Sequence, residues 1–163
     1  MTQSGTGAAA MAVCKYIVLV LFAVMLIAGA SGVRQSDAAF DDVRSAVVTA
    51  ARFEAVQEGD GQMLRRLYGL DPSAYEDFTL YYPATNMGAE ELLLVKLTDM
   101  SQRDEVLAAI ESRLKTQITT FEGYGPDQVA MLEAAAVEDG GNYILFVSSA
   151  QADTARRAFS DAL

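Results

Sequence analysis

The sequence predicts an α+β domain carried behind one apolar helix that is either a transmembrane or a signal segment. Residues 16–33 contain no charge, two pairs of short strand-like runs follow later in the chain, and each pair precedes an amphipathic helix. We therefore expect one domain in which helices pack on one face of an antiparallel sheet of about four strands, built as two ββα units.

The apolar segment, residues 16–33, determines how the chain divides. It reads YIVLVLFAVMLIAGASGV and holds ten Ile, Val, Leu or Phe residues. On an insertion scale these residues favour the bilayer by roughly 3 to 6 kcal/mol. Eighteen residues are close to the shortest helix that crosses the hydrocarbon core. We take Tyr16, Leu19, Phe22 and Leu26 as the membrane-anchor residues.

Two fates of this segment remain open. The small residues at 28–30 match a signal-peptidase site. Either the helix is retained and the protein crosses the cell membrane once, with residues 1–15 as a disordered cytoplasmic tail, or cleavage after Ala30 releases a secreted protein. Both alternatives place residues 34–163 outside the cytoplasm as a single domain.

The composition excludes several classes of function. The chain has a net charge of −10, and all 22 of its Asp and Glu residues follow the apolar segment. So acidic a domain offers no surface for nucleic acid. The chain has no His, and Cys14 is its single Cys. The domain therefore lacks Ser–His–Asp and Cys–His nucleophile systems and zinc thiolate sites. We expect no enzyme, no cofactor and no metal.

The first half of the domain predicts two helices and a turn. A helix capped by Ser36 or Asp37 is expected to reach about Val56, and EGDG at 58–61 ends it. A short helix over Gln62–Tyr68 then ends at Gly69. Asp71 and Pro72 supply the cap and first residue of one more turn.

Two strands follow as a hairpin. Phe78–Tyr82 alternates with period two and ends at Pro83, and Glu91–Leu97 forms the second strand. The run LLLV inside the second strand is apolar throughout, which is typical of an interior strand.

The second half repeats this order. Ser101 is expected to cap a helix from about Asp104 to Phe121. Its predicted buried stripe consists of Leu107, Ile110, Leu114, Ile118 and Phe121. A shorter helix begins at Pro126, a turn at 139–141 joins a strand near Val137 to Tyr143–Val147, and a last helix spans Asp153–Leu163.

Four segments in order carry a resemblance to a known family. They are LYGLDP (67–72), AEELLLVKL (89–97), FEGYGPDQ (121–128) and GNYILFVSS (141–149). Together they resemble a bacterial family, classed as a domain of unknown function, of small extracytoplasmic proteins tethered by an N-terminal helix or lipid. The resemblance implies an envelope location, a single α+β domain and no assigned catalytic residues. This chain departs from lipid-anchored members because no Cys follows the apolar segment.

The candidate binding residues of the first hairpin are Tyr81, Tyr82, Asn86 and Glu90. Tyrosines there could stack on a sugar or a peptide, although cross-strand packing is the commoner role of such residues. Glu90 and Glu91 could divide acid and base roles. Adjacent residues on a strand face opposite ways, however, so these two carboxylates cannot converge on one bond.

The other candidates are Tyr124 and Gly125, beside the helix that begins at Pro126. They could line a ligand pocket next to free backbone amides. The alternative is structural, because Gly-Pro commonly starts a helix.

From these observations we expect a non-enzymatic, membrane-tethered extracytoplasmic domain that binds a protein or polysaccharide of the cell envelope. A carboxylate-based enzyme acting on envelope polysaccharide and a small-ligand sensor are the alternatives.

Overall fold

The computed structural model describes residues 35–163. The predicted cytoplasmic tail and the apolar segment, with Tyr16, Leu19, Phe22 and Leu26, lie outside the described residues. No helix within 35–163 combines the length and apolar character that a membrane crossing requires.

The described part of the chain is α+β, as predicted, with five α-helices and one antiparallel sheet of five strands. The helices are α2 (Phe40–Ala51), α3 (Gly61–Tyr68), α4 (Arg103–Phe121), α5 (Pro126–Glu133) and α6 (Ala152–Ala162). The strands are β1 (Val56–Gly59), β2 (Asp77–Pro83), β3 (Glu91–Lys96), β4 (Ala136–Gly140) and β5 (Tyr143–Ser148).

The sheet has the strand order β1-β2-β3-β5-β4. The two predicted hairpins, β2–β3 and β4–β5, are confirmed, and β3 pairs with β5 at the centre. The prediction of four strands is wrong by one. Residues 56–59, expected as a helix end and a turn, form the edge strand β1 beside β2. The first helix stops at Ala51 because Arg52 adopts a left-handed conformation with φ 50°.

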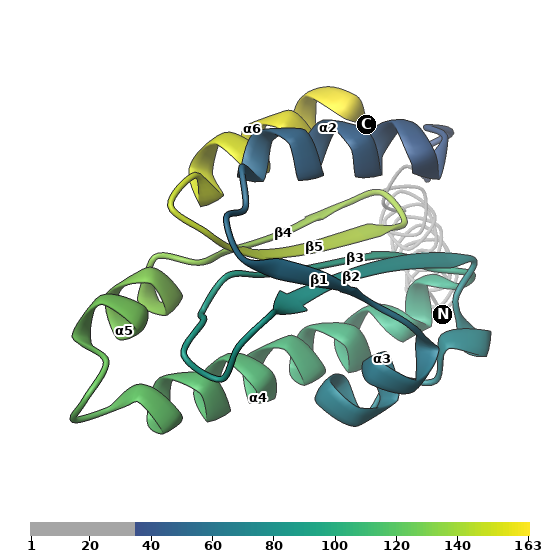
Figure 1. Ribbon diagram of the computed structural model, residues 1–163. Helices are drawn as coiled ribbons and strands as arrows, with labels where there is room; N and C mark the ends of the chain where they lie inside the picture. The colour runs from purple at the N-terminus through teal and green to yellow at the C-terminus, as the bar shows by residue number, and fades with distance from the viewer. Residues whose placement is uncertain (1–34) are drawn as a thin grey trace, which may run out of the picture. The chain divides into compact units, whose positions relative to one another are not determined.

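Helices cover both faces of the sheet, so the prediction of one covered face is also wrong (Figure 1). Leu92 and Leu94 belong to the cluster that contains α2 and α6. Leu93 and Val95 belong to the cluster that contains α3 and α4. Successive side chains of a strand point to opposite faces, so an uninterrupted apolar run requires cover on both. The helices that follow the two hairpins, α4 and α6, therefore lie on opposite sides.

Most of the expected helix ends are observed. Asp60 accepts a hydrogen bond from the Met63 amide at the start of α3, and Gly69 ends that helix with φ 72°. Asp71 caps the single turn that begins at Pro72. The starts of α2 and α4 differ from prediction, because α2 has no side-chain cap and Asp99, rather than Ser101, caps the turn that leads into α4.

The residues that precede α2 contact the last residue of the chain. The hydroxyl of Ser36 donates to the carbonyl oxygen of Leu163 at 3.1 Å. The Tyr143 hydroxyl, on the interior strand β5, donates to the carbonyl oxygen of Ala38 at 2.7 Å. The chain thus enters the domain beside the point where α6 ends.

Candidate functional site

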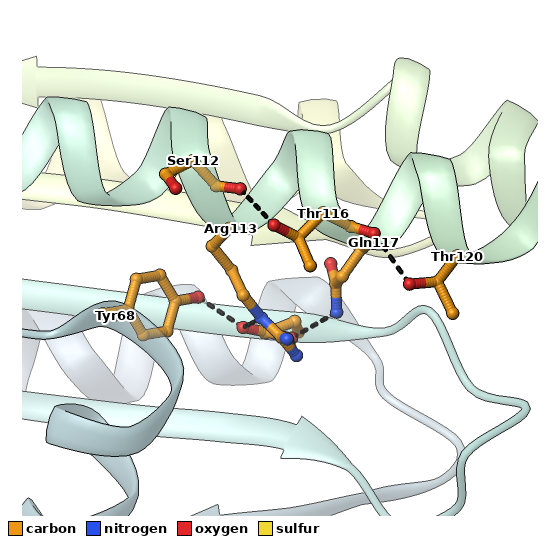
Figure 2. Close-up of polar contacts among 7 residues, drawn as sticks. Tyr68, Ser112, Arg113, Thr116, Gln117 and Thr120 are labelled. Atoms are coloured by element: carbon orange, nitrogen blue, oxygen red, sulfur yellow. Dashed lines mark hydrogen bonds and ion pairs between the residues drawn. The ribbon is translucent and has the colours of Figure 1, made fainter.

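A fully buried carboxylate lies at the start of β3. Glu91 is 0% exposed, and the side chains of Tyr68, Arg113 and Gln117 all donate to it. Figure 2 shows these three labelled side chains pointing toward one another. Arg113 is bidentate, with Nε 3.0 Å from Oε1 and Nη2 2.8 Å from Oε2. Gln117 Nε2 lies 2.6 Å from Oε2. We call these four residues the Glu91 network.

The geometry of the surrounding elements explains why the network forms. Glu91 shares a face of the sheet with Leu93 and Val95, and that face is covered by α3 and α4. Arg113 and Gln117 are four residues apart on α4, so both side chains leave the same side of the helix. Tyr68 is the last residue of α3. One carboxylate therefore ties two helices to the sheet.

The network shifts the pKa values of Tyr68 and Arg113. Burial, followed by the charge of Glu91, raises the pKa of Tyr68 well above its usual value, so this hydroxyl stays protonated. Burial opposes the charge of Arg113, but the hydrogen bonds from Arg113 to Glu91 prevail and raise the arginine's pKa. The ion pair is thus fixed, and the side chain of Arg113 is only 17% exposed.

Two buried polar atoms beside the network have no hydrogen-bond partner among the described residues. They are Oε1 of Gln117 and Oγ of Ser148. Ser148 is the register partner of Glu91 across β3 and β5. Native proteins leave few such atoms unpaired. At this end of the sheet the Glu91 carboxylate has all its hydrogen bonds, whereas these two neutral oxygens have none among the described residues.

A groove of about 450 Å³ opens over the network. Its lining, which we call the arginine groove, consists of Gln57, Arg66, Leu67, Tyr82, Pro83, Ala84, Thr85, Asn86, Gly88, Arg113, Gln117, Thr120 and Phe121. Two of these residues are arginines and none is an Asp or Glu. In a chain with 22 acidic and 12 basic residues, a lining of this composition is a local reversal of charge.

A second hollow of about 280 Å³ adjoins the arginine groove and shares Arg66 and Tyr82 with it. Glu58 and Asp60 line this hollow. Asp60 is engaged as the cap of α3. Among residues 35–163 no cluster of three or more potential metal ligands occurs.

The structure separates the predicted hairpin residues. Tyr82 and Asn86 line the arginine groove. Tyr81 faces the other way and stacks on Phe53 at 6.1 Å between ring centroids. Glu90 accepts hydrogen bonds from the backbone amides of Glu54 and Ala55, each at 3.0 Å, and thereby fastens the link between α2 and β1.

Tyr124 and Gly125 lie in a different place, in the turn between α4 and α5. Tyr124 is 56% exposed and its ring packs on Phe121 at 5.8 Å. A Cβ at Gly125 would lie 2.9 Å from the Phe121 ring, so this position requires glycine for close packing. Tyr124 lines a separate cavity of about 410 Å³, whereas Gly125 is not part of that lining.

The sequence did not identify Arg66, Arg113 or Gln117 as site residues. The buried stripe of α4 is Val106, Ile110, Gln117 and Phe121, whereas Leu107, Leu114 and Ile118 are only partly buried. The buried face of α4 therefore lies to one side of the predicted one, which followed the apolar residues alone. Arg113 and Gln117 continue the spacing of Val106 and Ile110, and this was the signal that could have found them.

Comparison with known proteins gives one kind of match. The family model described as a domain of unknown function (DUF4358) matches residues 49–149, which is more than half of the chain. The matched range includes all five strands, the Glu91 network and the whole arginine groove. No curated protein and no solved structure matches.

Proposed function

We propose that this protein, which belongs to the DUF4358 family of domains of unknown function, is a non-catalytic binding module held at a membrane by residues 16–33. In this proposal the domain lies outside the cytoplasm and recruits a component of the cell envelope. The uncharged apolar segment supports the membrane attachment.

The arginine groove is the single observation that supports binding. It is an open depression of about 450 Å³, large enough for part of a polymer or a peptide. Its floor includes Arg113, whose position is fixed by Glu91. A preorganised polar group within a partly apolar lining is the usual design of a recognition site.

The described acids favour binding over carboxylate catalysis. Glu91 is committed to four hydrogen bonds, and Glu90 is committed to two backbone amides. Asp60 caps a helix. Glu58 and Asp60 both line the hollow beside Tyr82, so they are the carboxylates through which the enzyme alternative can be tested. A variant with Glu58→Gln should therefore retain the binding activity.

The test compares two bulky substitutions on α4, one inside the groove and one outside it. Thr120 is exposed and lines the groove, whereas its neighbour Thr119 is exposed and does not. Tagged full-length protein is recovered from detergent-solubilised membranes after cross-linking, and co-purifying protein and polysaccharide are measured. We expect the original chain and Thr119→Trp to recover the same component and Thr120→Trp to lose it.

Either of two results overturns the proposal. Equal recovery by Thr120→Trp shows that the groove is not the binding site, and recovery of no reproducible component contradicts the binding role. The membrane attachment has its own measurement: a mature N-terminus at Ser31 would mean that the helix is cleaved, and a cytosolic reporter fused after Leu163 would contradict the extracytoplasmic location.

A further inference from the structure

We infer that the arginine groove recognises an oxyanion, a carboxylate or phosphate group, on its ligand. This inference rests on the proposed function and narrows it to a chemical class. It is carried by the guanidinium groups of Arg66 and Arg113 and by the complete absence of carboxylates from the groove lining.

Arg113 has one of its two hydrogen-bonding edges free. Glu91 takes the edge made by Nε and Nη2. Nη1 and the second hydrogen of Nη2 form another fork, for which residues 35–163 provide no partner. A guanidinium fork matches the paired oxygens of a carboxylate or a phosphate. Glu91 thus orients Arg113 and leaves its other edge for a ligand.

Arg66 supplies the net positive charge. Glu91 neutralises Arg113, so that pair contributes no net charge to the floor of the groove. The side chain of Arg66 forms neither an ion pair nor a hydrogen bond with any residue in 35–163, and it lines both the groove and the adjoining hollow. Its neighbour Arg65 is instead paired with Asp71 at 2.8 Å.

The chain's acidic residues lie outside the lining of the groove. Exposed charges farther away than about 8 Å are largely screened at physiological ionic strength. The groove lining itself presents arginines and neutral donors such as Asn86 and Gln57 and contains no carboxylate. Outside the ion pair with Glu91, the acids Glu58 and Asp60 share the adjoining hollow with Arg66 but do not line the groove.

The unpaired oxygen of Gln117 adds a second requirement. Glu91 fixes the Gln117 amide by accepting from Nε2, so Oε1 stays an acceptor without a partner among the described residues. Gln117 also lines the groove. A ligand that carries a hydroxyl or N–H group beside its oxyanion would satisfy both Arg113 and Gln117. Sugar acids and sugar phosphates have this combination.

The experiment titrates three matched probes into isotopically labelled full-length protein in a non-ionic detergent at constant ionic strength. The probes are glucuronate, glucose 6-phosphate and uncharged glucose. We expect one or both anions to shift the amide signals of Asn86, Gln117 and Thr120, and glucose to leave them in place. A response to glucuronate alone identifies a carboxylate as the preferred source of the oxyanion, and a response to the phosphate alone identifies a phosphate.

Matched variants on α3 complete the test. Because a hydrogen bond to a charged group contributes strongly to binding, Arg66→Gln should weaken the binding of the anion about tenfold or more. Arg65→Gln, which removes the same charge from the neighbouring position, should leave it unchanged. Anion binding that survives Arg66→Gln unaltered overturns the inference, and so does a lack of response to either anion.

The outcomes separate this inference from the proposed function. If glucose shifts the same signals as strongly as the anions, the groove is a binding site but not one for oxyanions, and the inference alone fails. Loss of envelope-component recovery in Thr120→Trp would still support the proposed function in that case.

Discussion

Glu90 and Glu91 are neighbours in sequence, yet their carboxylates hold different parts of the fold. Glu90 accepts from two backbone amides in the link between α2 and β1, while Glu91 accepts from side chains of α3 and α4. The sequence-based argument that these two acids do not act on one bond agrees with these partners. Each of them instead has a distinct effect on stability.

Replacing Arg113 by Met should destabilise the domain by about 3 kcal/mol, because it leaves a buried carboxylate without its counter-ion. Chemical denaturation of the original and variant proteins measures this loss. The control is Arg65→Met, which removes an exposed ion pair and should cost less than about 1 kcal/mol. The double variant Glu91→Leu/Arg113→Met should be more stable than Arg113→Met alone, since it removes the orphaned charge. Equal losses in all three variants would contradict this account of the network.

Replacing Glu90 by Ala should free the backbone amides of Glu54 and Ala55. We expect a loss of about 1 kcal/mol in stability, typical of a hydrogen bond that fastens a loop. Hydrogen exchange gives the sharper measurement: the amides of residues 54 and 55 should exchange faster, while those of the interior strand β5 change only with global stability. Unchanged protection at 54 and 55 would show that the Glu90 carboxylate is not their partner in solution.

Replacing Ser148 by Ala should leave the domain as stable as before or stabilise it by about 1 kcal/mol. The reason is that the Ser148 hydroxyl is buried without a partner among the described residues, so its removal relieves a desolvation cost. Thermal or chemical unfolding measures the effect. A clear destabilisation would mean that Ser148 has a hydrogen-bond partner in solution.

The domain should lose stability above about pH 10. Burial, with added repulsion from acids, raises the pKa of Tyr68 well above 10.0 and that of Tyr75 to about 12. The unfolded chain releases these protons near the ordinary tyrosine pKa, while the folded chain retains them. The two tyrosines therefore contribute their full stabilisation below the pKa that they have in the unfolded chain. This stabilisation is lost as the pH rises through the pKa values that they have in the folded chain.

Urea unfolding at a series of alkaline pH values measures this decline. A tyrosine that is neutral when folded and ionised when unfolded contributes a slope of about 1.4 kcal/mol per pH unit. Tyr68→Phe cannot ionise, so its stability should fall less steeply than that of the original chain. Parallel slopes for the two proteins would exclude Tyr68 as a source of the pH dependence.

The sequence predicts the elements of this fold better than their arrangement. Period-two and apolar runs locate both hairpins, and Gly69 and Asp71 mark real helix ends, because these signals act within a few residues. The uninterrupted run in β3 already implies two buried faces, but only the assembled sheet shows which helix covers each. Strand β1 has four residues and depends on pairing with β2, so local propensity carries little information about it.

The candidate site is less predictable for a related reason. Position on a hairpin predicts Tyr82 and Asn86 as binding residues, and the structure places both in the arginine groove. Gln117 is buried and Arg113 partly buried because both donate to Glu91, 26 and 22 residues away in sequence. A polar residue on a helix is predicted to face solvent unless its partner across the core is known. Long-range pairing of this kind is invisible to a pattern within one helix.

The contact between Ser36 and Leu163 affects how the domain can be joined to other proteins. Since its two ends meet at one corner, the domain could be inserted into a surface loop of a carrier protein without forcing that loop apart. Force applied between the two ends would first separate α2 from α6, which pack together on one face of the sheet. The strands would separate only afterwards.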